Sequence, residues 1–252
     1  MRSTTRPTGA AKKTVERLLV AAGTACAAYQ DEHLRDLTCT KIQCDEIWSF
    51  CYAKDANLPD DKIDKYGYGS IWTWVAICAD TNLIPCWHVG ARDAGAAYHF
   101  IHDLKSRMVN RIQLTTDGYK PYLPAVEDAF GANVDYATLV KMYGQDRGKE
   151  AHYSPPRCIG CATIGVRGNP DPAEISTSYV ERSNLTVRMT NRRFTRLTNA
   201  FLKKVENHEH AMAINMMHYN FCRIHQTLRV TPAMEAGIAD HVWSLEEIAS
   251  LL

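Results

Sequence analysis

Hydrophobic and polar positions divide the first third of the chain into strand-like segments. Residues 41–52 are rich in β-branched, aromatic and sulfur side chains and contain no Gly or Pro, which predicts a central strand. Residues 71–79 and 83–89 are also apolar, aromatic and β-branched. Asp80, Thr81 and Asn82 between them are typical of a turn. These three segments predict an antiparallel meander.

Helical and strand-like patterns then alternate. Residues 94–109 carry an apolar stripe at helical spacing, residues 111–116 form a short strand that ends at Asp117, and a helix follows through Phe130. Residues 134–140 predict a fifth strand. Three further segments complete the chain: an irregular, Pro- and Gly-containing insertion at about 143–176, helices over about 178–226 with a break near Thr198 and Asn199, and two short helices in 231–252.

This order of elements, βββαβαβα, predicts an α/β fold of the ribonuclease H-like kind, with a mixed five-stranded sheet flanked by helices on both faces. A meander followed by βα units also occurs in other α/β proteins. We expect three parts: residues 1–36 with a basic arm and a helix, a catalytic domain over 37–230, and short C-terminal helices over 231–252.

The N-terminal part allows two interpretations. Residues 1–8 predict a disordered arm, and a helix with apolar positions on one face begins at Ala10. Its opposite face carries Lys12, Lys13 and Arg17. On the pattern alone an amphipathic helix packed on the core is favoured. The alternative is the second helix of a helix-turn-helix, whose polar face enters a DNA major groove.

The charge of the chain is unevenly distributed. The 252 residues sum to a net charge of only +1, but residues 182–204 contain no acid and seven bases: Arg182, Arg188, Arg192, Arg193, Arg196, Lys203 and Lys204. Local basic clusters indicate a polyanionic partner. The chain has no signal peptide and no membrane-length apolar run, and its nine scattered cysteines fit a reducing cytoplasm. Cys158 and Cys161 are half of a zinc-ribbon signature, and we interpret them as loop thiols.

Three acids occupy informative positions in this scheme. Asp45 lies in the middle of the first strand, where a carboxylate is costly to bury unless it is paired or binds a cation. Asp117 ends the fourth strand, which the predicted sheet places beside the first. Glu181 lies near the start of the basic helix, which can present it to both aspartates. Glu46 alternates to the opposite face of its strand and is not expected to share the site.

Such a cluster predicts a metal site. Carboxylates that repel one another are stabilised in the ionised form by a divalent cation, and all-oxygen ligands select Mg²⁺ or Mn²⁺. Two ions about 4 Å apart can support an in-line phosphoryl displacement. Arg188 follows Glu181 by two helical turns, so it shares a helix face with Glu181 and can hold a phosphate.

The local sequences around these acids resemble those of bacterial DDE insertion-sequence transposases. Asp45 stands in Gln-Cys-Asp-Glu-Ile-Trp-Ser-Phe, Asp117 in Thr-Thr-Asp-Gly-Tyr and Glu181 in Tyr-Val-Glu-Arg-Ser-Asn. Arg188 matches a basic residue of that superfamily. The ending from Tyr219 to Met234 is similar to its Asn-Phe…Arg-x-His-x-x-Leu…Thr-Pro tail. The resemblance covers about residues 8–240 and is closest to the insertion-sequence-one type. Of the N-terminal helix-turn-helix found in that family, only a segment similar to its last helix is present, over residues 9–20. This indicates an N-terminally truncated copy.

The resemblance implies an integrase-like core that cleaves DNA at transposon ends and joins them to a target. Asp45, Asp117 and Glu181 would be the catalytic residues and the ligands of two Mg²⁺ or Mn²⁺ ions. It implies a homodimer or larger synaptic complex on DNA, no membrane, and a place at the nucleoid in the bacterial cytoplasm. The DNA-binding residues would be Arg182, Asn184, Arg188, Arg192, Arg193, Arg196, Lys12, Lys13 and Arg17. Two alternatives remain: a metal-dependent nuclease that does not join DNA, and a non-catalytic DNA-binding remnant that regulates transposition.

Overall fold

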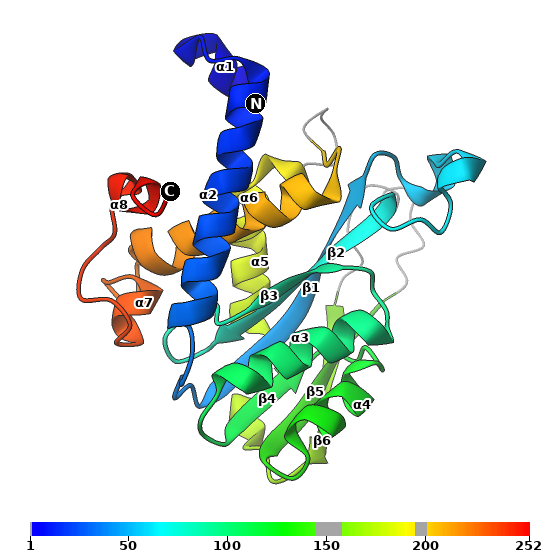
Figure 1. Cartoon of the computed structure of the whole chain (residues 1–252). Helices are drawn as coiled ribbons and strands as arrows, with labels where there is room; N and C mark the ends of the chain where they lie inside the picture. Colours follow the sequence, from blue (N-terminus) through cyan, green and yellow to red (C-terminus); the bar gives the residue numbers. More distant parts are fainter. Residues whose placement is uncertain (1, 145–157, 195–200) are drawn as a thin grey trace.

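The structure, a computed structural model, describes residues 2–144, 158–194 and 201–252 of the chain. Its centre is a mixed six-stranded sheet with the strand order β3-β2-β1-β4-β5-β6, flanked by helices (Figure 1). The strands are β1 (Lys41–Cys51), β2 (Gly69–Cys78), β3 (Trp87–Gly90), β4 (Ile112–Thr116), β5 (Val134–Tyr143) and β6 (Cys158–Arg167).

The strand pairing confirms the predicted meander and the predicted neighbours of the first strand. β2 pairs antiparallel with both β1 and β3. On its other side β1 pairs parallel with β4, which pairs parallel with β5. The last residue of β4, Thr116, lies opposite Cys44. Asp117 therefore leaves the sheet next to the position of Asp45.

The sixth strand corrects the expectation of five. β6 pairs antiparallel with β5 at the edge of the sheet, within the segment expected to be irregular. Most of its residues are exposed on both faces, so its sequence lacks the apolar–polar alternation of a half-buried strand. Cys158 and Cys161, interpreted as loop thiols, lie on this strand and are exposed. Residues 145–157 of the expected insertion lie outside the described residues.

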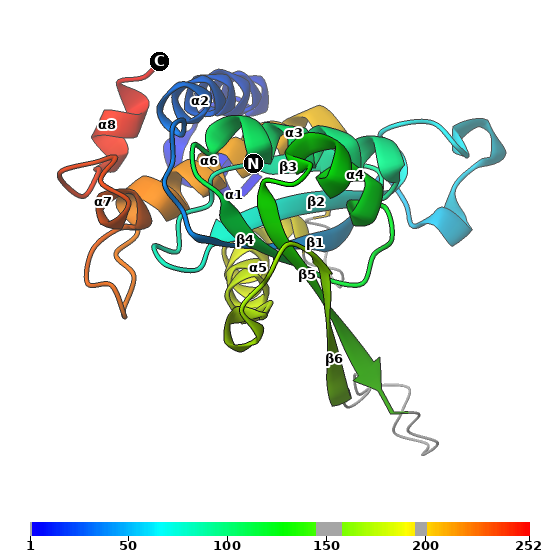
Figure 2. The ribbon, with the colours of Figure 1, turned by 90° about the horizontal axis from the view of Figure 1, so that it is seen from below.

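Helices cover both faces of the sheet, as Figure 2 shows. α2 (Lys12–His33), α3 (Ala94–Arg107) and α4 (Tyr122–Phe130) lie on one face, and α5 (Ser178–Thr190) lies on the other. α6 (Val205–Met217) contributes to the apolar clusters of both faces. Successive strand residues point to opposite faces, so that Trp74 joins the first cluster and Val75 the second.

The N-terminal segment differs from the expectation. Residues 2–8 form the short helix α1 (Arg2–Thr8), and not a disordered arm. The chain turns at Gly9, whose φ of +67° favours glycine, and then enters α2. The buried positions of α2 include Gly23, Cys26 and Gln30, and α2 packs against α6. This packing agrees with the interpretation of an amphipathic helix on the core.

The C-terminal helices are shorter than expected. α5 ends at Thr190, and α6 begins only at Val205 and continues into the π-helical turn His218–Cys222. The predicted break near Thr198 and Asn199 lies outside the described residues. The two predicted tail helices are confirmed as α7 (Pro232–Glu235) and α8 (Leu245–Ala249), and Ser244 and Glu247 form a capping box at the start of α8. No helix in the described part of the chain is both long and apolar enough to span a membrane.

Candidate active site

An acidic cluster lies where β4 ends beside β1. Asp45 and Glu46 come from β1, and Asp117 directly follows β4. One carboxylate oxygen of each lies within 4.8 Å of the others. β1 continues to Cys51 while β4 stops at Thr116, so on the β4 side no strand in the described part of the chain pairs with Asp45 or Glu46. Asp117 extends into the space beside them.

The presence of Glu46 in this cluster corrects the expectation that it lies away from the site. Arg92 donates from Nε to Oε2 of Glu46 over 3.0 Å and from a terminal nitrogen to Oδ2 of Asp117 over 3.3 Å. Strand alternation fixes the direction in which Glu46 leaves β1. It does not prevent a long side chain from meeting a group beyond the end of the neighbouring strand. Oε1 of Glu46 is buried and has no hydrogen-bond partner among the described residues.

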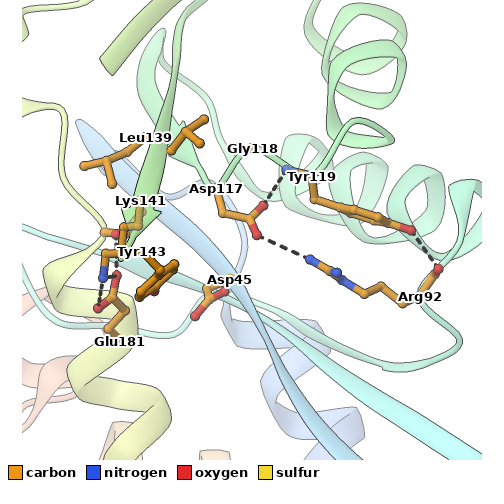
Figure 3. A pocket seen from close by; sticks show the side chains of 11 residues that line it. Asp45, Arg92, Asp117, Gly118, Tyr119, Leu139, Lys141, Tyr143 and Glu181 are labelled. Carbon is orange, nitrogen blue, oxygen red and sulfur yellow. Dashed lines mark hydrogen bonds and ion pairs between the residues drawn. The ribbon is translucent and has the colours of Figure 1, made fainter. Parts of the chain in front are cut away.

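Arg92 is held rigidly in the site. Its guanidinium lies 4.0 Å from the ring centre of Tyr119 and 4.8 Å from that of Trp72. Tyr119 also donates its hydroxyl to the carbonyl of Arg92 over 2.7 Å (Figure 3). Sequence reasoning missed Arg92, because a single arginine in the connection after β3 belongs to no motif.

Glu181 lies across the cavity from Asp117 and is paired with a lysine (Figure 3). Nζ of Lys141, on β5, is 2.5 Å from both carboxylate oxygens of Glu181. Thr177, which precedes α5, donates its hydroxyl to the same carboxylate over 2.5 Å. Glu181 thus lines the cavity, as predicted, but it is not among the three carboxylates within 4.8 Å of one another. Lys141 was not predicted.

The cavity that these groups share is open and has a volume of about 580 Å³. It brings together the three predicted catalytic residues and the two cations that sequence reasoning missed. Its lining consists of Asp45, Arg92, Asp117, Gly118, Tyr119, Leu139, Val140, Lys141, Tyr143, Thr177 and Glu181. Both anionic and cationic groups therefore face one space, an arrangement suited to a phosphate together with a metal ion.

Asn184 has a different place from the predicted one. It was expected to contact DNA, but the residue is only 5% exposed, and its side chain donates from Nδ2 to Oδ2 of Asp45 over 2.9 Å. It follows Glu181 by three residues and shares a helix face with it. Asn184 thus orients Asp45 and does not offer its amide to a DNA surface.

The site raises the pKa of two carboxyl groups. Burial raises the pKa of Asp45 to about 6; the charge of Asp117 adds to this effect, and the hydrogen bond from Asn184 opposes it. Burial raises the pKa of Glu46 to about 7; the charge of Asp117 adds to the shift, and the neighbouring Tyr122 hydroxyl and the charge of Arg92 oppose it. Carboxyl groups with such pKa values are partly protonated near neutral pH, and a bound cation would favour their ionised form.

These features fit a hard divalent cation. Asp45, Glu46 and Asp117 offer only oxygen ligands, which Mg²⁺ and Mn²⁺ prefer. Glu181 would join them only after leaving Lys141.

The predicted DNA-binding bases lie on two separate faces. Arg182, Arg188 and Arg192 are exposed on or just after α5, and Arg193 is half-buried. Lys12, Lys13 and Arg17 are exposed on α2, on the other side of the sheet (Figure 2). Arg196 lies outside the described residues.

Comparisons with known proteins do not identify a family for this chain. No protein-family model matches the chain, and no curated protein matches it. Among solved structures the chain is similar to a piggyBac transposase synaptic complex with hairpin DNA, at a TM-score of 0.34 and 11% identity, over 85% of this chain and 52% of that chain. The chain thus spans about half the length of that neighbour. The similarity is too low to indicate a function.

Proposed function

We propose that the protein is a DDE transposase, which cleaves DNA at transposon ends and joins the freed ends to a target. The observation that carries the proposal is the acidic cluster Asp45, Glu46 and Asp117, of which Asp45 and Asp117 line one open cavity together with Glu181. The sequence resemblance around Asp45, Asp117 and Glu181 points to the same chemistry and to a bacterial insertion-sequence type.

The sheet topology supports a ribonuclease H-like core. An antiparallel β1-β2-β3 meander followed by parallel β4 and β5 is the arrangement expected for that fold, to which β6 adds an edge strand. We propose that residues 37–230 are the catalytic unit, with residues 1–36 and 231–252 as helical additions.

In this proposal Asp45, Glu46 and Asp117 hold Mg²⁺ or Mn²⁺, as one ion or two. When bound, such a cation polarises a phosphoryl oxygen and lowers the pKa of a water or hydroxyl nucleophile. The residues of the chain supply the remaining functions. Asn184 orients Asp45, and the stacked guanidinium of Arg92 binds a non-bridging oxygen of the reacting phosphate. Lys141 keeps Glu181 in place until substrate enters.

DNA is the proposed partner, bound through the exposed bases beside the cavity. Arg188 follows Glu181 by two turns and is exposed. Joining two DNA ends to a target requires that several DNA segments be held together. We therefore propose that the protein acts as a dimer or larger assembly on DNA.

The test is cleavage and joining of a labelled duplex that carries the sequence flanking the gene, with a supercoiled plasmid as target. We expect products with Mg²⁺ or Mn²⁺, none with EDTA, and at least about a hundredfold loss in Asp45→Asn and in Glu181→Gln. Asp60→Asn, an exposed acid outside the cavity, is the matched control and should retain full activity. Wild-type rates in Asp45→Asn would contradict the proposal.

The products also separate the alternatives. A nuclease would use the same acidic cluster for hydrolysis and give cleaved DNA without joined products. A non-catalytic regulator would bind DNA and give neither product in the presence of metal.

A further inference from the structure

A second groove lies on the other side of α5 from the active site. It has a volume of about 770 Å³ and lies between three segments: the turn after β2, α5, and residues 219–228 after α6. α5 advances by about 100° per residue, so that Arg182 and Thr186 line this groove while Glu181 lines the active-site cavity. One helix therefore separates the two hollows and contributes to both.

The groove is positively charged. Arg182 and Arg223 line it, and among the described residues neither guanidinium forms an ion pair with an acid. The acid in its lining, Asp80, is bound by Nζ of Lys41 at 3.1 Å and by the hydroxyl of Thr40 at 2.5 Å. Two arginines that face one groove without an ion-pair partner are suited to an anion.

Both arginines also act on His225, which lies in the same lining. Burial lowers the pKa of His225, and the charges of Arg223 and Arg182 lower it further. The three side chains are thus close enough to interact. The groove is also lined by the hydroxyl residues Ser178, Thr186 and Thr227, of which Thr186 donates to the carbonyl of Arg182. This set of donors matches a phosphodiester chain better than a single carboxylate.

The wall that carries Arg223 and His225 is fixed to the core. Asn220 is fully buried; its side chain donates to the carbonyl of Ile84 over 2.9 Å and accepts from the amide of Ile84 over 3.0 Å. The amide of His225 donates to the carbonyl of Val230, and that of Arg229 to the carbonyl of His225, which closes a compact loop. A preorganised wall lowers the entropic cost of binding.

The groove also has apolar surface for sugars or bases. Tyr179 is 44% exposed and Ile224 is 55% exposed, and both line the groove. Between the groove and the active site, Leu185 and Met189 are exposed on α5. Arginines next to exposed aromatic and apolar side chains are typical of surfaces that follow a nucleic-acid strand.

We propose that this groove binds phosphates of the DNA strand that continues from the reacting phosphodiester across α5. The inference rests on the proposed function for the path of the strand, and it assigns to Arg182 and Arg223 a shared role in holding DNA outside the reacting centre. The Arg-x-His motif at 223–225, near the end of the chain, is then part of the DNA-binding surface.

The test compares the double variant Arg182→Gln/Arg223→Gln with the wild type in the full chain. A fluorescent 30-base-pair duplex would be titrated in EDTA at several salt concentrations, so that binding is measured without cleavage. Loss of two phosphate contacts should raise the Kd at least about tenfold and lower the slope of log K against log salt by about 1 to 2. The charge-preserving Arg182→Lys/Arg223→Lys variant should retain most of the affinity and the slope.

Arg35→Gln is the matched control, because Arg35 contacts Ser106 of α3 on the opposite face of the sheet. It should bind DNA like the wild type. Unchanged thermal melting would show that the Gln double variant is folded; if it is not, the Lys variant and each single Gln variant carry the test.

The outcomes separate this inference from the proposed function. If the wild type cleaves DNA and the folded double variant binds it with unchanged Kd and salt slope, the groove does not bind DNA. If the wild type does not cleave but the double variant loses affinity, the groove binds DNA and the proposed catalysis fails. If inorganic phosphate protects the wild type from thermal unfolding while DNA affinity is unaffected by the substitutions, the groove is a small-anion site and the inference is wrong.

Discussion

The side-chain amide of Asn184 donates a hydrogen bond to Oδ2 of Asp45 over 2.9 Å and so connects α5 to β1 at the acidic cluster. Glu181 lies one turn earlier on the same helix face. A single segment, Glu-Arg-Ser-Asn, therefore supplies one carboxylate to the cavity and positions another. The register of α5 on the sheet determines the geometry of the site.

Loss of this amide should reduce catalysis more than stability. In Asn184→Ala, Asp45 loses a donor to its charged form, and a hydrogen bond of that type contributes about 1.5–3 kcal/mol. We expect the cleavage rate to fall by about 10- to 100-fold. The melting temperature should change by only a few degrees. Asn215→Ala removes an amide that bonds to Thr190 away from the cavity and should leave the rate unchanged. Equal rates for the two variants would contradict a positioning role for Asn184.

Lys141 should compete with metal ions for Glu181. Its ammonium contacts both carboxylate oxygens of Glu181, so removal of its charge in Lys141→Met leaves a more negative cavity. We expect Mn²⁺ to bind about tenfold more tightly in the variant by isothermal titration calorimetry, a change of about 1.4 kcal/mol. Lys141→Arg keeps the charge and should bind Mn²⁺ like the wild type. Weaker Mn²⁺ binding in Lys141→Met would show that Lys141 supports the metal site.

The sequence was sufficient to predict the neighbourhood of Asp45 and Asp117. Three apolar segments joined by a turn give the meander, and the following βα units place the fourth strand beside the first. Each step depends on local patterns of burial, which short-range sequence carries. The pairing of Cys44 with Thr116 is the structural result of those patterns.

Other features of the site depend on contacts that no local pattern contains. Glu46 reaches Arg92 and Asp117 only because β4 stops at Thr116, and the length of β4 relative to β1 is a property of the whole sheet. Lys141 and Glu181 are far apart in sequence and meet because α5 packs on β1 and β2, in the same sheet as β5. β6 has no buried stripe, because an exposed edge strand requires none.

The crossing of α2 and α6 should be sensitive to a single methyl group at Gly23. A Cβ there would contact Cβ of His210 and lie 2.6 Å from its Cα and 2.8 Å from its carbonyl oxygen. The two helix backbones would have to separate. We expect Gly23→Ala to lower the free energy of unfolding by about 1–3 kcal/mol, although alanine is favoured over glycine within a helix by about 1 kcal/mol.

Gly95→Ala is the matched control for this substitution. Gly95 also lies in a helix, but a Cβ there would meet only Oδ1 of Asp93, at 3.4 Å, among its near neighbours. In urea denaturation, the free energy of unfolding of Gly95→Ala should be equal to or above that of the wild type. If both Gly23→Ala and Gly95→Ala were more stable than the wild type, this would contradict the close contact between α2 and α6 at Gly23.

His208 should make the stability of the protein sensitive to acid. It is fully buried on α6, with Nε2 3.2 Å from the hydroxyl of Thr73, and burial lowers its pKa to about 3, with the charge of Arg193 adding to the shift. The unfolded chain, with an ordinary histidine pKa of about 6.5, binds the proton more readily than the folded one. The contribution of neutral His208 is therefore complete above about pH 6.5 and is lost as the pH falls toward 3, by up to about 1.4 kcal/mol per pH unit. Between about pH 6.5 and 5, the free energy of unfolding in urea should fall by about 2 kcal/mol more for the wild type than for His208→Gln. Parallel pH profiles for the two proteins would mean that His208 is protonated in the folded state or reaches solvent before unfolding.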